Sequence, residues 1–274
     1  MLLRLALLCL LAASTVHANK PNFVFILCDD LGYGDVKCNN PQGKIATPHM
    51  DAIAARGVRF TDAHSPSAVC TPTRYGVMTG RYNWRTKLQS SVLGGLSPRL
   101  IEEGRLTVAS MLKAQGYKTA CVGKWHLGMD WVKLPGKDVS ELSIEKPEQV
   151  YNVDYTQPIT NGPTSVGFDT YFGIAASLDM VPYCYIENDR VTANPTEKVK
   201  LAMNAGPGKN GFTREGPGAP GFRGEDVLPT FTKRAVEIIS NHATANEPFF
   251  LYLPLNSPHT PILPSEKWQG KSGI

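Results

Sequence analysis

Strand patterns and helix patterns alternate at both ends of this 274-residue chain, and this alternation limits its possible folds more than any other feature. Residues 23–27 form an unbroken apolar run, typical of a strand that is buried on both faces. Residues 47–57 predict a helix, from a threonine cap and a first-turn proline to a closing glycine. Near the other end, a helix pattern over residues 225–242 precedes a buried-strand pattern over residues 248–255. The sequence therefore predicts an α/β fold with a mostly parallel sheet flanked by helices.

Further elements are predicted between these ends. Residues 57–65 have the pattern of a short strand, and a helix is expected over about residues 72–78. Thr107 is a candidate cap for a helix that Gly116 closes, and residues 117–123 form the next strand pattern. Each of these elements fits the same α/β alternation.

The first 18 residues have the pattern of a secretory signal peptide. Arg4 gives a positive start, residues 5–13 are almost wholly apolar, and Val16 and Ala18 predict cleavage before Asn19. The apolar run is shorter than the roughly 20 residues that span a bilayer, so no stable membrane anchor is expected. The sequence predicts an exported protein, periplasmic or extracellular, or lysosomal or secretory in a eukaryote.

Residues 19–274 are interpreted as one domain. The stretch from about residue 133 to residue 224 is rich in Pro and Gly and lacks a regular period, so it is predicted to be a long surface excursion. The formal net charge is +4 without a long basic run, which gives no support for nucleic acid as a partner.

Five cysteines follow the predicted signal peptide, namely Cys28, Cys38, Cys70, Cys121 and Cys184. An odd number in an exported protein implies that at least one is free, paired with another molecule or chemically altered. If Cys70 is that residue, the other four could form two disulfides. The apolar neighbours of Cys28 and Cys121 fit buried free thiols equally well.

Polar and reactive side chains follow the predicted strands at their carboxyl ends, where ligands bind in open α/β sheets. An aspartate pair follows the first strand, a lysine and a histidine follow the strand over 117–123, and a histidine follows the last strand. A cysteine and an arginine lie where a loop enters a helix. Seven side chains are therefore expected at one edge: Asp29, Asp30, Cys70, Arg74, Lys124, His126 and His259.

Each of these side chains also has a structural interpretation. An aspartate pair after a strand is common turn chemistry, and as a metal site it would suit Ca²⁺ or Mg²⁺ better than zinc. Either histidine could be a hydrogen-bonded structural residue, and the lysine and arginine could be surface residues. Only their joint placement at strand ends favours a functional site.

Cys70 does not fit two familiar thiol enzymes. A phosphatase of the Cys-x₅-Arg type needs an arginine where this chain has Gly76, and the local sequence does not match a papain-like nucleophile. A helix N-terminus and Arg74 would lower the pKa of the Cys70 thiol. An exported thiolate would, however, be exposed to oxidation, which disfavours a plain thiol mechanism.

The segment "CTPTRYGVMTGR", residues 70–81, resembles the signature of the formylglycine-dependent sulfatases. Four other blocks resemble that family in its order: "CDDLGYGD", "TPHMDAIAARGVRFTDAHS", "GYKTACVGKWHLG" and "PFFLYLPLNSPHTP". The resemblance implies an alkaline-phosphatase/sulfatase-like N-terminal domain. It also implies that the domain is incomplete at the C-terminus, because the family's later Asp-Asn pair and lysine have no counterpart here.

The resemblance implies that a formylglycine-generating enzyme oxidises Cys70 to Cα-formylglycine. One hydroxyl of its hydrate would attack the sulfur of a sulfate-ester substrate, and the second would later expel sulfate. Asp29, Asp30 and the modified Cys70 would bind Ca²⁺, with Mg²⁺ a less suitable ion. Arg74 would hold the hydrate and the carboxylates.

The resemblance also implies roles for the remaining side chains. Lys124 and His259 would contact the sulfate and the leaving oxygen, with His259 protonating the leaving group. His126 would help to deprotonate the second hydroxyl.

Three functions follow from these patterns. The first is a sulfuric ester hydrolase for aryl or carbohydrate sulfates. The second is a phosphonate or phosphate ester hydrolase of the same superfamily, and the third is an inactive, truncated exported binding protein. Substrate selectivity is expected to lie in the excursion over residues 133–224.

Overall fold

The computed structural model describes residues 20–204 and 210–272. The predicted signal peptide, residues 1–18, lies outside the described residues. Within them, no helix is both long enough and apolar enough to cross a membrane.

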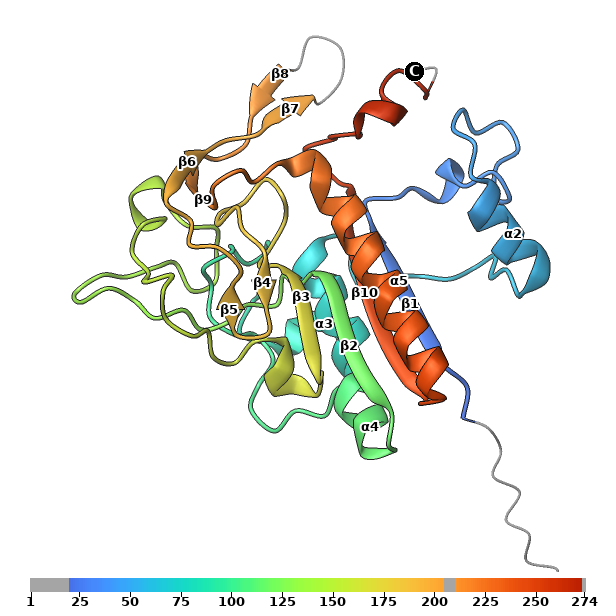
Figure 1. Ribbon diagram of the computed structural model, residues 1–274, viewed down its shortest axis with the longest axis horizontal. Coiled ribbons are helices and arrows are strands. Elements are labelled where there is room, and N and C mark those ends of the chain that lie inside the picture. Colours follow the sequence, from blue (N-terminus) through green and yellow to red (C-terminus); the bar gives the residue numbers. More distant parts are fainter. Residues whose placement is uncertain (1–19, 205–209, 273–274) are drawn as a thin grey trace, which may run out of the picture.

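One six-stranded sheet organises the molecule, in the strand order β1-β10-β2-β3-β4-β5 (Figure 1). The first four strands in that order are parallel, and β4 and β5 run antiparallel to their neighbours. The predicted α/β fold with a mostly parallel sheet is confirmed. The strands are β1 (Phe23–Asp29), β10 (Phe249–Pro258), β2 (Lys118–Lys124), β3 (Thr170–Ile174), β4 (Ile186–Glu187) and β5 (Arg190–Val191).

Helices cover both faces of the sheet (Figure 1). The long helix α5 (Val227–Ala245) packs Val227, Phe231 and Ala235 against apolar side chains of β2, β3 and β10. On the other face, α3 (Cys70–Thr79) and α4 (Val108–Ala114) contribute Tyr75, Met78 and Ala109 to a second cluster. Burial of these apolar faces on either side of the parallel strands stabilises the layered architecture.

The predicted helices are present at close to their expected bounds. α2 covers Pro48–Arg56, with Thr47 and Gly57 at its two ends. Helix α4 is capped by Thr107, whose hydroxyl accepts the backbone N–H of Ser110. Helix α3 begins at Cys70, two residues before the expected start, and this shift makes Cys70 the first residue of the helix.

Near the N-terminus, the strand predicted over residues 23–27 is present as β1, but its predicted burial is wrong, and the strand predicted over residues 57–65 is absent from the described structure. The apolar run at the start of β1 is not buried on both faces: Phe23, Val24, Phe25 and Ile26 are 42–52% exposed. Among the described elements no helix packs extensively over β1. Residues 57–65 form no strand and have an irregular backbone. The apolar residues that suggested a strand there, Val58 and Phe60, are exposed.

The irregular region from about 133 to 224 is more integrated than the sequence predicted. It supplies β3, which pairs in parallel with β2, and the short strands β4 and β5. It also forms two small antiparallel pairs, β6 (Glu197–Val199) with β9 (Gly216–Gly218), and β7 (Ala202–Asn204) with β8 (Asn210–Phe212). Buried aromatics such as Tyr155, Phe168 and Tyr171 anchor the region to the core.

Short 3₁₀ turns join these elements at Tyr33–Asp35, Asn83–Arg85, Pro147–Gln149, Pro163–Val166, Gly224–Asp226 and Glu266–Trp268. All five cysteines after the predicted signal peptide are free, and Cys121 and Cys184 are buried. Of the alternatives that the cysteine count left open, the structure has the free thiols rather than two disulfides.

Candidate active site

Helix α3 places Cys70 at the carboxyl edge of the sheet. The residue before it, Val69, has an extended backbone, so the helix begins abruptly and presents Cys70 in its first turn. The side chain is half-buried, while Thr71 and Arg74 on the same helix are fully buried. Unpaired N–H groups at a helix start favour negative charge at this position.

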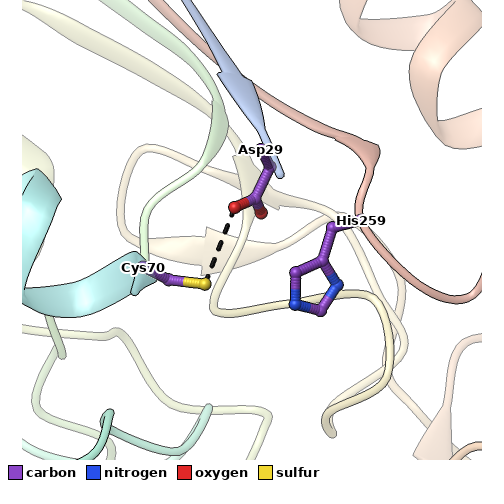
Figure 2. Close-up of side chains that lie close together, drawn as sticks. All are labelled: Asp29, Cys70 and His259. Carbon is purple, nitrogen blue, oxygen red and sulfur yellow. Dashed lines mark hydrogen bonds between the residues drawn. The ribbon is translucent and has the colours of Figure 1, made fainter. Parts of the chain in front are cut away.

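The strand ends bring three more predicted residues to the same place. Asp29 is the last residue of β1, Lys124 is the last residue of β2, and His259 follows the end of β10, which lies between them. Because parallel strands end at one edge, these side chains converge. Figure 2 shows Asp29, Cys70 and His259 facing one another from three different elements.

Asp29 is the centre of a buried charge cluster. Its Oδ2 accepts a hydrogen bond from the Lys124 ammonium group and lies 3.4 Å from Nη2 of Arg74. Its Oδ1 lies 3.6 Å from Cys70 Sγ. Lys124 Nζ also lies 3.2 Å from Cys70 Sγ. Lys124 and Arg74 are at most 1% exposed and Asp29 is 5% exposed. Two buried cations thus face one carboxylate beside the sulfur, an arrangement that suits an anionic ligand.

The cluster shifts the pKa values of its members. Burial disfavours the ionised form of Asp29, but the charges of Lys124 and Arg74 outweigh burial and hold the pKa of the carboxyl group below its usual value. Burial and the neighbouring Arg74 lower the pKa of Lys124, against the attraction of Asp29. Arg74 also donates to the Lys124 carbonyl over 2.6 Å, which fixes the end of β2 against α3.

The neighbours of its two ring nitrogens fix the orientation of the His259 ring. Nδ1 lies 2.5 Å from the Thr260 carbonyl and therefore carries the hydrogen, since a carbonyl can only accept. Nε2 lies 3.8 Å from Asp30 Oδ2, and a hydrogen bond with Cys70 raises the pKa of the imidazole against the effect of burial. The Nε2 edge is thus the one available for proton transfer.

Cys70 has an acidified thiol in this surrounding. Burial raises its pKa, but the hydrogen bond with His259 and the charge of Lys124 outweigh burial, so the pKa falls below the usual 9.0. The other buried thiols behave in the opposite way: burial raises the pKa of Cys184 to about 12. Cys70 is therefore expected to be more reactive than the buried thiols of Cys121 and Cys184.

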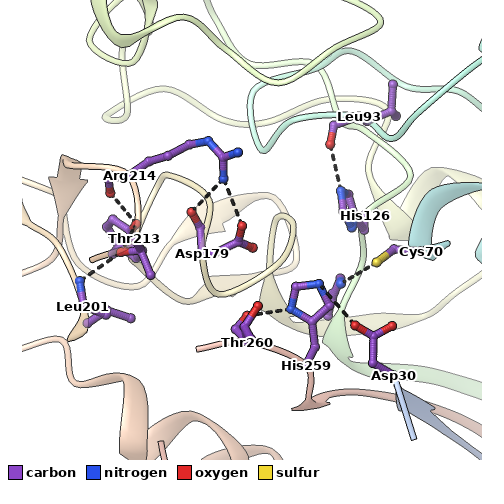
Figure 3. A network of polar contacts seen from close by, with 12 residues as sticks. Asp30, Cys70, Leu93, His126, Asp179, Leu201, Thr213, Arg214, His259 and Thr260 are labelled. Atoms are coloured by element: carbon purple, nitrogen blue, oxygen red, sulfur yellow. Dashed lines mark hydrogen bonds and ion pairs between the residues drawn. The ribbon is translucent and has the colours of Figure 1, made fainter. Parts of the chain in front are cut away.

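His126 is buried directly after β2, two residues beyond Lys124. Its backbone has the left-handed φ of 55°, and its Nε2 lies 2.8 Å from the Leu93 carbonyl (Figure 3). Nε2 therefore carries the hydrogen, and Nδ1 is a buried acceptor without a hydrogen-bond partner among the described residues. Burial and the charge of Lys124 lower the pKa of His126 well below 6.5, so the ring is neutral at pH 7.

Asp30 is the least enclosed of the seven predicted residues. Its backbone φ is 65° and its side chain is 60% exposed, at the mouth of an open pocket of about 260 Å³. Asp29, Cys70 and Arg74 line the same pocket. The structure thus gathers all seven residues at one sheet edge, six of them buried or half-buried and Asp30 at the rim.

Two contacts at this edge were not predicted from the sequence. The Leu93 carbonyl accepts from His126, and the Leu93 N–H donates to Thr71 Oγ1 over 3.2 Å. These interactions use backbone groups or a hydroxyl inside a helix, and neither leaves a pattern of charged or nucleophilic residues in the sequence.

The donor atoms here suit part of a hard cation's coordination shell. Ligand atoms of Asp29, Cys70 and His259 all lie within 4.8 Å of one another, and Asp30 stands beside them. Asp29 Oδ1 is turned toward Cys70, away from the cations that contact Oδ2. Ca²⁺ binds about 6–8 oxygens, so two carboxylates and an oxygen at the position of Cys70 Sγ fit such an ion, with further oxygens from water or substrate.

Comparison with known proteins decides the family. The sequence matches the family model described as Sulfatase over residues 21–273, nearly the whole chain. The chain belongs to the sulfatase family. The resemblance to formylglycine-dependent sulfatases is thereby confirmed, and the sheet order places the described part of this family member in the alkaline-phosphatase-like fold.

Individual relatives agree with the family. The chain is 35% identical to an N-acetylgalactosamine-6-O-sulfatase of Bacteroides thetaiotaomicron, covering 94% of this chain and 52% of the relative. It is 30% identical to human arylsulfatase A, covering 98% of this chain and 47% of that protein. This sulfatase family member therefore spans about half the length of these curated relatives.

Solved structures of similar proteins have the same fold. The fold is similar, with a TM-score of 0.74 and 34% identity, to a structure from work on the metabolism of multiple glycosaminoglycans by Bacteroides thetaiotaomicron. That match covers 93% of this chain and 55% of the other. A sulfatase from Pseudoalteromonas sp. shares the fold at a TM-score of 0.61 and 21% identity.

The acidified thiol gives a testable prediction for the unmodified chain. We expect iodoacetamide to alkylate Cys70 with a pH midpoint below 9.0, because the thiolate is the reacting form and its pKa is lowered. Replacing His259 by alanine should move the midpoint upward, whereas Cys184 should stay unreactive at every pH that leaves the fold intact. Peptide mass spectrometry after timed alkylation measures each site. A Cys70 midpoint at or above 9.0 would contradict the described cluster.

Proposed function

We propose that this chain hydrolyses sulfate monoesters, with Cys70 as the site of the nucleophile after its oxidation to Cα-formylglycine. The observation that carries the proposal is the placement of Cys70 at a helix start, within 3.2 Å of Lys124 and 3.6 Å of Asp29, in a sulfatase-family chain. The formylglycine hydrate supplies one hydroxyl that attacks sulfur and a second that allows sulfate to be expelled. A separate formylglycine-generating enzyme is the implied partner for the oxidation.

The cluster's own residues would bind and orient the sulfate group. Lys124 and Arg74 are the buried cations beside Cys70, and they would offset charge on the sulfate oxygens. Arg74 is held by its contacts with Asp29 and with the Lys124 carbonyl, so its guanidinium group would keep the nucleophile and the carboxylate aligned.

The two histidines would divide the proton transfers. Nε2 of His259 lies 3.8 Å from Asp30 Oδ2, which supports a role for this nitrogen in protonating the leaving oxygen. His126 is neutral, and its Nδ1 acceptor has no hydrogen-bond partner among the described residues, so His126 would take the proton from the second hydroxyl. Two imidazoles with opposite pKa shifts are suited to act as acid and base in one reaction.

Asp29 and Asp30, with the modified Cys70, are the residues that would hold Ca²⁺, in preference to Mg²⁺. The ion would supply positive charge that orients the sulfate and favours the ionised nucleophile. Asp29 would remain ionised for this purpose at neutral pH because Lys124 and Arg74 outweigh its burial and lower its pKa.

We infer a carbohydrate sulfate as the substrate class, because one relative is named for N-acetylgalactosamine-6-sulfate chemistry and is 35% identical. Residues 19–274 would form part of the catalytic domain, and the N-terminal signal pattern supports export. The edge of the pocket that would contact the sugar includes the loop from Ser65 to Val69.

The test co-expresses the chain with a formylglycine-generating enzyme and measures hydrolysis of N-acetylgalactosamine 6-sulfate, an aryl sulfate and the matching phosphate monoesters. We expect the carbohydrate sulfate to have the highest kcat/KM, with activity lost on calcium chelation. A clear preference for phosphate esters would overturn the assignment to sulfate. An absence of hydrolysis by fully modified, calcium-loaded chain would favour the inactive binding protein.

A further inference from the structure

A backbone loop, residues 93–97, links His126 to the helix that carries Cys70. His126 Nε2–H donates to the Leu93 carbonyl over 2.8 Å (Figure 3). The Leu93 N–H donates to Thr71 Oγ1 over 3.2 Å. Thr71 directly follows Cys70 in α3. The two peptide groups of one residue thus set the position of the histidine relative to the start of the nucleophile helix.

The 93–97 loop is itself held from outside. The Leu96 N–H donates to Glu145 Oε1 over 2.5 Å, although the two residues are 49 positions apart. The Trp131 indole N–H donates to the Gly95 carbonyl over 3.0 Å. Glu145 is 6% exposed and lies in the irregular region, so a long-range contact fixes this loop.

The loop has no room to move toward its neighbours. A Cβ at Gly94 would lie 2.2 Å from Glu145 Oε1, and a Cβ at Gly95 would lie 1.9 Å from the Val181 carbonyl oxygen. Both distances are far below contact distance, so the backbone is pressed between Glu145 and Val181. A side chain at either glycine would push the loop, and the Leu93 carbonyl with it.

The contact uses one oxygen of the Glu145 carboxyl group. Its Oε2 is buried without a hydrogen-bond partner among the described residues. A buried polar atom without a hydrogen-bond partner destabilises a fold. The Glu145 carboxyl group therefore carries a folding cost, at a contact that leads to His126 through Leu93.

We propose that Glu145 is a positioning residue for His126. Its carboxyl group fixes the 93–97 loop, and the Leu93 carbonyl then holds the imidazole in the Nε2–H tautomer, which leaves Nδ1 as an acceptor with no partner in the described part of the chain. The inference rests on the proposed function, in which His126 takes a proton from the second hydroxyl of the modified Cys70. Without a side-chain oxygen to accept the Leu96 N–H, the Leu93 carbonyl loses its fixed position and the ring loses its single tautomer.

The experiment compares Glu145→Leu with Glu145→Gln in the full chain. Long-range ¹H–¹⁵N correlation spectra distinguish the two neutral histidine tautomers, and a His126→Gln variant assigns the His126 signals. We expect wild type and Glu145→Gln to show the Nε2–H pattern, because glutamine keeps an oxygen for the Leu96 N–H. Glu145→Leu should show a tautomer mixture and a kcat about 10- to 100-fold lower, with little change in KM.

Asp169→Leu is the matched control. Asp169 also accepts a backbone N–H, that of Thr119 over 2.8 Å, but at the opposite end of β2. Its replacement should leave the His126 spectrum unchanged. If Glu145→Leu does not fold, Thr71→Val and Thr71→Ser test the same loop, since only serine keeps the acceptor for the Leu93 N–H.

The tautomer measurement does not depend on turnover, so the two proposals can fail separately. If the wild-type chain has no sulfatase activity but Glu145→Leu or Thr71→Val still changes the His126 tautomer, the proposed function is wrong and the positioning role stands. The positioning role is overturned if Glu145→Leu folds and keeps the wild-type tautomer and the wild-type kcat. If Glu145→Leu does not fold, the same result for folded Thr71→Val overturns it.

Discussion

Replacing Cys70 by serine is expected to lower the turnover of sulfate esters by at least about 10⁴-fold, the scale seen when a nucleophile is removed. A serine hydroxyl could accept the sulfate group, but it has no second hydroxyl on the same carbon to expel it. The Cys70→Ser chain should therefore stop after one sulfate transfer to the serine, and Cys70→Ala should not react with the ester at all. Steady-state kinetics measure the loss, and intact mass spectrometry detects a retained sulfate on the serine variant.

Cys38→Ser provides the matched control for this prediction. Cys38 is a half-buried free cysteine whose thiol contacts Asn39 and which does not line the pocket around Cys70. Its replacement should leave turnover close to that of the wild-type chain. Retained multiple turnover by Cys70→Ser would show that the nucleophile lies elsewhere.

Replacing Asp29 by asparagine is expected to destabilise the fold by about 3–5 kcal/mol, because it leaves Lys124 and Arg74 buried without their counter-charge. Urea unfolding measures the change in the free energy of unfolding. Asp30→Asn is the matched control: its side chain is 60% exposed, so the free energy should change by no more than about 0.5 kcal/mol. Both variants should lose activity if both carboxylates hold the metal ion. A loss of less than about 1 kcal/mol in Asp29→Asn would contradict the buried cluster.

The pH dependence of the Asp29 contribution follows from the direction of its pKa shift. Burial raises the pKa of Asp29, but Lys124 and Arg74 outweigh it, so the folded-state pKa lies below the usual 3.8. Between the folded-state pKa and the unfolded-state pKa of Asp29, the unfolded chain binds more protons than the folded chain. The stabilisation of the fold by ionised Asp29 is therefore fully present above pH about 4. It is lost as the pH falls through the folded-state pKa. The difference in stability between wild type and Asp29→Asn should narrow in the same range.

Much of the site was predictable because strand ends and reactive residues leave local patterns. Asp29, Lys124 and His259 each follow a recognisable apolar run, and parallel pairing brings such ends together. The helix that carries Cys70 was also expected, although its first turn begins earlier than its proline suggested. Local patterns therefore predicted which side chains meet.

The remaining features depend on pairing and packing over long distances. The apolar run in β1 indicated burial on both faces, yet the burial of a strand's faces depends on the elements that pack over it, and none of the described helices packs extensively over β1. β3 was missed because five strand residues stand among glycines and prolines. The contact between Glu145 and the Leu96 N–H spans 49 positions and uses a backbone donor, which no local pattern reveals.

The most direct measurement relates activity to the chemical state of Cys70. Preparations that differ in their exposure to the formylglycine-generating enzyme would be digested with trypsin, and the fraction of formylglycine in the peptide over residues 60–74 would be measured by mass spectrometry. The same preparations would be assayed for sulfate release with Ca²⁺ present. We expect activity to rise in proportion to the formylglycine fraction and to extrapolate to zero in its absence. Activity that is independent of this fraction, or that is absent at full conversion, would contradict the assignment of Cys70 as the nucleophile of a sulfatase.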